Sequence, residues 1–222
     1  MHKLKNIEIV SLGVNCYPRT VLTRTGVKPS KADGELSCPF DLVRHYLPNI
    51  IHYLETDFSD YFDDIHFVIR KRNFLDFRKR GKWHKNDGTV FYHDLDCQYY
   101  DKEKLFTRIK NRIDNFHKII KSETPILFVL NLEKDEERIS DLYKILKKIC
   151  PHKKFKLLII DFFDKTNENN THKDIAVLKL PLPFEDWTNG WNGKKWIKSD
   201  FGKYVEKCVS TYTERLIRQE FN

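Results

Sequence analysis

The residue with the clearest chemical potential is Cys16, which ends the motif Ser-Leu-Gly-Val-Asn-Cys at residues 11–16. An apolar strand pattern at residues 7–10 precedes it, and a short helix pattern at residues 17–25 follows and ends at Gly26. We therefore expect Cys16 in a turn between a strand and a helix, where backbone N–H groups and the helix dipole favour a thiolate. Such a thiolate attacks acyl groups. The alternative is a buried packing residue, the usual role of a cysteine.

Three neighbours of Cys16 fit this chemistry. Gly13 lets the backbone turn tightly, and Pro18 suits the first turn of a helix. The side chain of Asn15, or nearby backbone N–H groups, could hold the oxyanion of a tetrahedral intermediate. The sequence thus predicts a nucleophile and its oxyanion site in one turn.

The order of motifs resembles a bacterial family of unknown function classed as papain-like cysteine peptidases. After the first motif come Pro39-Phe40-Asp41, then His93-Asp94, then a basic helix and an apolar strand. Leu42 stands where the family usually has Trp, a change that affects a pocket wall rather than the chemistry. The resemblance covers roughly the first two thirds of the chain. A weaker similarity, to capsule-biosynthesis proteins, suggests acyl transfer as another use of the thiol.

His93 is the expected general base, because an imidazole beside a thiol accepts its proton and stabilises the thiolate. The alternative for His93 is a structural role at the end of a strand. Three other histidines are assigned to exposed faces of predicted helices: His45, His52 and His117. The sequence leaves undecided which residue orients His93. Asp41 ranks first by its motif, although it could instead cap a helix; Asn131 and Asp94 are the other candidates.

A cluster of tryptophans follows late in the chain, namely Trp187, Trp191 and Trp196. Exposed aromatic side chains on a loop stack on sugars or close over a substrate, and they serve equally well to fill a core. We predict that they bind substrate. We expect no metal site, because the five cysteines are scattered and no H-E-x-x-H motif is present. We also expect no cofactor, since the chain lacks a Walker loop and a G-x-G-x-x-G motif.

The second half of the chain predicts an α/β fold. Continuous apolar strands alternate with amphipathic helices, which indicates a largely parallel central sheet flanked by helices. The expected strands are residues 126–130, 155–160 and 175–180, and the expected helices are residues 103–121, 135–150 and 201–221.

Between the Cys16 turn and this half we expect a small β-hairpin or meander insertion. Residues 65–70 and 89–92 have strand character, with turn residues between them. Ahead of them, residues 39–54 have an apolar helical spacing. We expect Pro48 to split this run into two helices, because proline removes a backbone donor.

Composition bounds the remaining possibilities. With 222 residues, 40% hydrophobic and 14% aromatic, the chain is expected to form a single α/β domain over residues 1–222. No apolar run is long enough to span a membrane and no leader pattern is present, which predicts a cytoplasmic protein. The net charge is +8, but the basic residues are dispersed, so we do not expect a nucleic-acid partner.

We conclude from the sequence that the protein is a cysteine-nucleophile hydrolase. Its substrate would be a peptide, a glycan or a small molecule. The first alternative is an acyltransferase that modifies cell-surface polysaccharide from an acyl-CoA donor. The second alternative is a non-catalytic protein that binds a carbohydrate or anionic partner through the basic residues 70–82 and the tryptophan loop.

Overall fold

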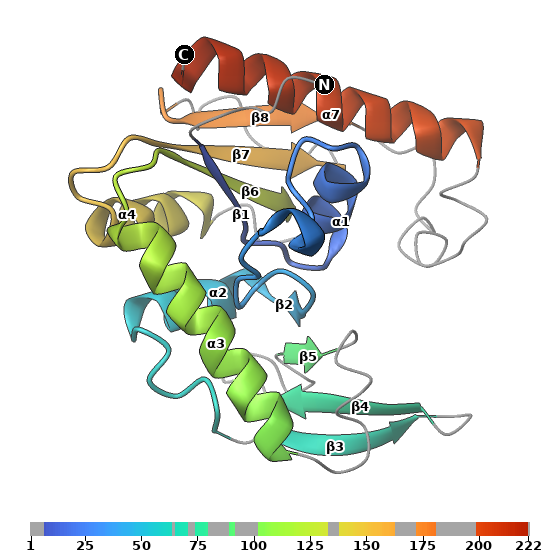
Figure 1. The fold of residues 1–222 in the computed structure, drawn as a ribbon, viewed down its shortest axis with the longest axis vertical. Helices are drawn as coiled ribbons and strands as arrows, with labels where there is room; N and C mark the ends of the chain where they lie inside the picture. The colour runs from blue at the N-terminus through green and yellow to red at the C-terminus, as the bar shows by residue number, and fades with distance from the viewer. Residues whose placement is uncertain are drawn as a thin grey trace.

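The chain folds around two four-stranded sheets that differ in the direction of their strands (Figure 1). The computed structural model describes residues 7–63, 65–70, 74–79, 89–91, 102–132, 138–162, 172–180 and 199–221. The first sheet is parallel and carries the Cys16 turn. The second sheet is antiparallel and is the insertion expected from the sequence.

The parallel sheet has the strand order β1-β6-β7-β8. Its strands are β1 (Glu8–Ser11), β6 (Ile126–Leu132), β7 (Phe155–Asp161) and β8 (Ile175–Lys179). All three pairings are parallel. The prediction of a parallel sheet flanked by helices is therefore confirmed.

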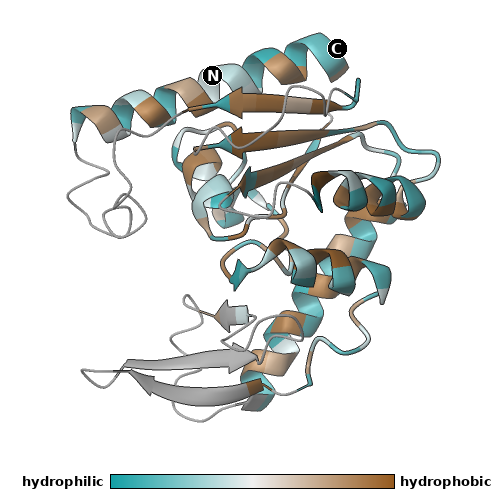
Figure 2. Ribbon diagram, turned by 180° about the vertical axis from the view of Figure 1, so that it is seen from behind, coloured by the Kyte–Doolittle hydropathy of each residue, from teal (hydrophilic) through white to brown (hydrophobic). Residues whose placement is uncertain are grey.

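Helices cover both faces of this sheet because its buried strands are apolar on both sides. On one face, Val129 packs in a core with α1 (Tyr17–Arg24) and α7 (Asp200–Phe221). On the other face, Phe128 packs in a larger core with α2 (Leu47–Glu55), α3 (Lys102–Lys121) and α4 (Ile139–Ile149). Figure 2 shows hydrophobic residues concentrated on the parallel strands.

The antiparallel sheet has the order β2-β5-β4-β3. Its strands are β2 (Arg44–His45), β3 (Ile65–Arg70), β4 (Phe74–Lys79) and β5 (Thr89–Phe91). Ile65 and Phe91 belong to the same core as the helices on the second face of the parallel sheet. The larger core therefore joins the two sheets.

The segment around Pro48 differs from the sequence prediction. Residues 39–42 form turns, and Arg44–His45 is strand β2 rather than helix. Pro48 then lies in the first turn of α2, so it begins one helix instead of splitting two. The physical reason is that the first turn needs no N–H from proline, and proline's fixed φ suits that turn.

Candidate functional site

The turn between β1 and α1 places Cys16 at the first position before the helix, as the sequence predicted. Cys16 is the N-cap of α1 and is partly exposed. A Cβ atom at Gly13 would lie 2.1 Å from the backbone oxygen of Asn15, so only glycine fits this tight turn. Strand β1, Gly13 and helix α1 together fix the position of the Cys16 backbone, from which the thiol side chain extends.

The side chain of Asn15, the residue before the N-cap, accepts a hydrogen bond from the first residue of α1. Its Oδ1 accepts a hydrogen bond from the backbone N–H of Tyr17 at 2.9 Å. Pro18, the next residue, has no N–H to offer. An oxyanion at this turn would therefore need the Nδ2 of Asn15 or the backbone N–H of Cys16, rather than the amides of residues 17 and 18.

The electrostatic setting of Cys16 differs from the expected activated thiol. Burial raises the pKa of the Cys16 thiol, and the Thr20 hydroxyl and the backbone amide of Cys16 oppose this only in part. Desolvation thus outweighs the two hydrogen bonds that favour the thiolate, and the balance favours the protonated thiol. A nucleophilic role then requires a base that removes the proton during attack.

Helix α1 contributes Arg19 to a buried cluster of charged side chains. We call it the ion cluster, and its four members are Arg19, Lys28, Glu35 and Asp41. Arg19 Nη2 lies 2.6 Å from Glu35 Oε2, and Lys28 Nζ lies 2.8 Å from Glu35 Oε1. None of these side chains is more than 8% exposed. Burial alone would lower the pKa of Lys28, but Asp41 and Glu35 outweigh it, so the pKa is raised.

Asp41 connects the ion cluster to the turn at residues 38–41. Its Oδ2 accepts the backbone N–H of Cys38 at 2.7 Å and lies 3.2 Å from Arg19 Nε. Its Oδ1 has no hydrogen-bond partner among the described residues. Burial raises the pKa of Asp41, against the effect of Lys28 and Arg19. The alternative role as a helix N-cap is wrong, because Asp41 lies in a turn before β2.

Strand β2 links the Cys16 turn to the antiparallel sheet. The backbone N–H of His45 donates to the carbonyl of Val14 at 3.0 Å, two residues before Cys16. On its other side β2 pairs antiparallel with β5, with Arg44 opposite Val90. The carboxyl end of β5 therefore lies beside the amino end of β2, and Asp41 precedes that end by three residues.

Asn131 lies near the carboxyl end of β6, on the sheet face that α1 covers. Ser11 pairs with Val129, so Asn131 lies two residues beyond the end of β1, where the chain enters the Cys16 turn. It is 1% exposed, and its Oδ1 has no hydrogen-bond partner in the described part of the chain. A buried, unsatisfied acceptor costs about 1–3 kcal/mol, which a functional partner would offset.

His45 is not on an exposed helix face, as the sequence had suggested, but fully buried in β2. Its Nδ1 lies 3.0 Å from Thr89 Oγ1, and its Nε2 lies 3.1 Å from the Tyr61 hydroxyl. Both ring nitrogens are engaged, so the His45 side chain ties β2 to β5 and to the turn that carries Tyr61. The expected helix placement holds for His52 and His117, which pair with Asp60 and Asp57.

Several expected site residues lie outside the described residues: His93, Asp94, Trp187, Trp191 and Trp196. Their predicted roles stay predictions. Within the described ranges, no cluster of three or more His, Cys, Asp or Glu side chains is arranged to hold a metal ion. No helix in the described part of the chain is both long and apolar enough to cross a membrane.

The sequence of the chain decides its family. Residues 7–163 match the family described as "putative papain-like cysteine peptidase (DUF1796)". The chain belongs to this family. Cys16, Asp41 and Asn131 all lie in the matched residues, and the family supports a cysteine hydrolase as the broad class of activity. No match was found among curated proteins or among solved structures.

Proposed function

We propose that the protein hydrolyses an acyl compound, an ester, amide or thioester of a peptide or small molecule, with Cys16 as the nucleophile. The observation that carries this proposal is the position of Cys16 at the N-cap of α1, at the end of the tight turn that follows parallel strand β1. Cys16 is partly exposed, as a residue that meets a substrate must be. The family supports the same class of chemistry.

His93 is the proposed base. It follows the last residue of β5, Phe91, by two positions, and β5 is tied through β2 to the Cys16 turn. His93 takes the thiol proton as the Cys16 sulfur attacks the carbonyl carbon, and it returns that proton to the leaving group. Water then attacks the acyl-Cys16 thioester and gives a proton to His93. His93 returns this proton to the sulfur as the carbon–sulfur bond breaks, which releases the acid and the free thiol. The Asn15 side chain is the proposed oxyanion donor.

Asp41 is the proposed partner that orients the base. Two observations support it: Asp41 precedes the amino end of β2, beside the carboxyl end of β5, and its Oδ1 is buried with no hydrogen-bond partner among the described residues. Asn131 is the competing candidate, because its Oδ1 has the same property at the edge of the parallel sheet. The two assignments, Asp41 and Asn131, predict different effects of substitution.

The test uses p-nitrophenyl acetate as an ester probe and follows both nitrophenol release and the acetylated protein by mass spectrometry. We expect an acetyl adduct at Cys16, loss of turnover in Cys16→Ala, and little change in the matched control Cys208→Ala, since Cys208 is also partly exposed. His93→Ala should slow acetylation by about 10²–10⁴-fold. Equal labelling of Cys208, or turnover unchanged in Cys16→Ala, would refute the proposal.

The orienting residue is tested by the pH dependence of acetylation. If Asp41 orients His93, Asp41→Asn should shift the pH profile of kcat/KM, because it removes the negative charge of the base's partner, whereas Asn131→Val should leave the profile unchanged. Asn131→Val should also preserve stability, because it removes an unsatisfied buried acceptor. A shift caused by Asn131→Val and not by Asp41→Asn would reverse the assignment.

A further inference from the structure

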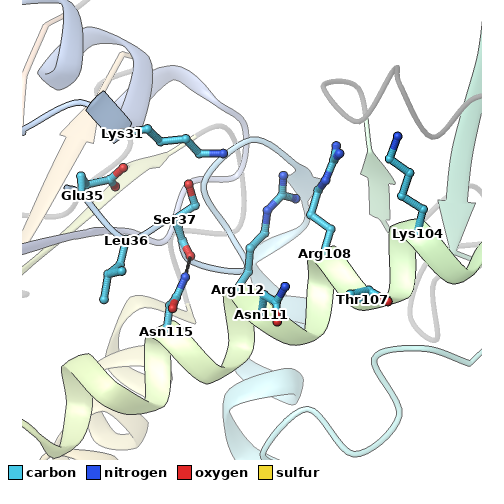
Figure 3. Close-up of a pocket in the computed structure, with 10 residues that line it drawn as sticks. All are labelled: Lys31, Glu35, Leu36, Ser37, Lys104, Thr107, Arg108, Asn111, Arg112 and Asn115. Carbon is cyan, nitrogen blue, oxygen red and sulfur yellow. Dashed lines mark hydrogen bonds between the residues drawn. The ribbon is translucent and has the colours of Figure 1, made fainter. Parts of the chain in front are cut away.

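A pocket with a volume of about 700 Å³ lies between α3 and the loop that carries the short helix η1 (Lys31–Asp33) (Figure 3). Small-molecule sites commonly have volumes of about 300–1,000 Å³. The pocket shares Glu35 with the ion cluster, but Cys16 does not line it. Its chemistry can therefore be considered apart from the thiol.

The wall of the pocket on α3 is a row of cations. Lys104, Arg108 and Arg112 lie on successive turns of the helix, and Lys31 faces them from η1. Figure 3 shows all four side chains extending into the same space on one side of α3. Eight residues of α-helix separate the first cation of the row from the last, a length of about 12 Å. Arg112 is only 5% exposed, so one cation of the row is held in a buried position.

Negative charge in the pocket is already compensated. Among the described residues that line it, Glu35 is the one carboxylate. Both oxygens of Glu35 face buried cations that do not line the pocket, Arg19 at 2.6 Å and Lys28 at 2.8 Å. Among the described residues that line the pocket, four cations therefore stand against one carboxylate whose charge is already paired elsewhere.

Neutral donors complete the wall. Thr107, Asn111 and Asn115 follow one another along α3 beside the cations, and all three line the pocket. The Nδ2 of Asn115 donates to the backbone oxygen of Ser37 at 3.1 Å, which ties the opposite loop to the helix. This hydrogen bond ties the loop to α3 at Asn115, and the wall offers hydroxyl and amide groups next to the charged row.

We propose that this pocket binds a small molecule with two or more phosphoryl groups in a row. Guanidinium groups match the oxygens of a phosphoryl group in a bidentate geometry, and a single phosphate would reach only part of a 12 Å row. Like charges four residues apart repel one another, and a polyanion relieves that repulsion. The proposal does not depend on Cys16 being catalytic.

The cations need not be unpaired for this purpose. Lys104, Arg108 and Arg112 each make a further interaction within the chain. An arginine has five N–H donors, so it can keep an internal partner and still donate to a ligand oxygen. Binding is therefore expected to add contacts to the row rather than to displace its existing ones.

The test is isothermal titration of the full chain, and of Cys16→Ala, with tripolyphosphate, orthophosphate and the tricarboxylate tricarballylate at one salt concentration. We expect tripolyphosphate to bind at least about tenfold more tightly than the other two probes, equally in both proteins. Arg108→Gln should weaken tripolyphosphate about tenfold or more, and the exposed Lys104→Gln should act in the same direction. Lys110→Gln, an exposed cation of α3 outside the pocket, is the matched control and should leave affinity unchanged.

Each of the following results would overturn the proposal. The first is no detectable binding of tripolyphosphate, or the same loss in Lys110→Gln as in Arg108→Gln. The second is equal affinity for tricarballylate, which would show a general anion site instead of a phosphoryl site. The third is tighter binding of a mixed-sequence RNA oligonucleotide with the same dependence on Arg108, which would make the pocket part of a nucleic-acid surface. Circular dichroism of each variant shows that it is folded.

Discussion

Replacing Glu35 by Gln tests how much of the fold around α1 depends on the ion cluster. Glu35 is the carboxylate that faces two cations, at 2.6 Å and 2.8 Å, and its side chain is 6% exposed. At an effective dielectric constant of about 20, each contact is an attraction of about 6 kcal/mol. Desolvation, several kcal/mol for each ion, opposes this gain. Removing the charge leaves Arg19 and Lys28 buried with Asp41 alone.

We therefore expect Glu35→Gln to lower the free energy of unfolding by about 3–5 kcal/mol, the usual cost of breaking a buried ion pair. For a chain of this size the melting temperature should fall by about 6–20 °C. Urea unfolding followed by circular dichroism measures the change directly. The slope of the transition should stay the same, because the variant changes stability and not the surface exposed on unfolding.

Asp141 supplies the matched control. It too is a carboxylate between two cations, with Arg138 at 3.5 Å and Lys144 at 3.7 Å, but its side chain is 45% exposed. Solvent screens such pairs, so Asp141→Asn should cost no more than about 1 kcal/mol. The reasoning fails if Glu35→Gln costs less than about 1 kcal/mol, or if the two variants are equally destabilising.

Two further predictions concern the turn and the cluster. Gly13→Ala should destabilise the chain by about 3 kcal/mol or more, because its Cβ would lie 2.1 Å from the backbone oxygen of Asn15. The control is Gly34→Ala, where φ is +86° and nothing lies near the added Cβ, so that it should cost about 1–2 kcal/mol. Equal melting temperatures of the two variants would contradict this prediction. Because the folded-state pKa of Lys28 is raised, its stabilising contribution is complete below the unfolded value of about 10.4 and is lost as pH rises through the folded value. Deprotonation of buried tyrosines also lowers stability as pH rises. The measurement is therefore the difference in unfolding free energy between the wild type and Lys28→Met from pH 9 upward. A difference that does not change with pH would refute the prediction.

The parallel sheet was predictable from sequence because its signal is local. Each buried strand is a short apolar run, and each helix repeats its apolar residues at one spacing, so β6, α4 and β7 are found near their expected bounds. The turn at Cys16 was predictable for a similar reason, since Gly13 and Pro18 restrict the backbone at their own positions. The family resemblance then named Asp41 and His93 as partners, which no local pattern could do.

The ion cluster was not predictable because its members follow no helix or strand spacing and each alone resembles a surface residue. Residues 28–38 are polar and turn-rich, which is typical of a solvated loop, yet Lys28 is 3% exposed. Only the arrangement of Glu35 between Arg19 and Lys28 makes that burial tolerable. The error at His45 has a similar origin, because a two-residue strand has too little periodicity to separate it from a helix.

The hydrogen bond from the amide of His45 to the carbonyl of Val14 makes that one amide a reporter of how the two sheets move together. In native-state hydrogen exchange, this amide proton exchanges with solvent deuterium only when β2 detaches from the Cys16 turn. Amides in the middle of β6 require larger unfolding events to exchange. A two-residue strand has little stability of its own, so this detachment should be among the more frequent local openings of the buried backbone. Each such opening would separate Cys16 from the strand that leads to its proposed base. The exchange rate of the His45 amide would therefore measure how often the proposed catalytic arrangement is interrupted.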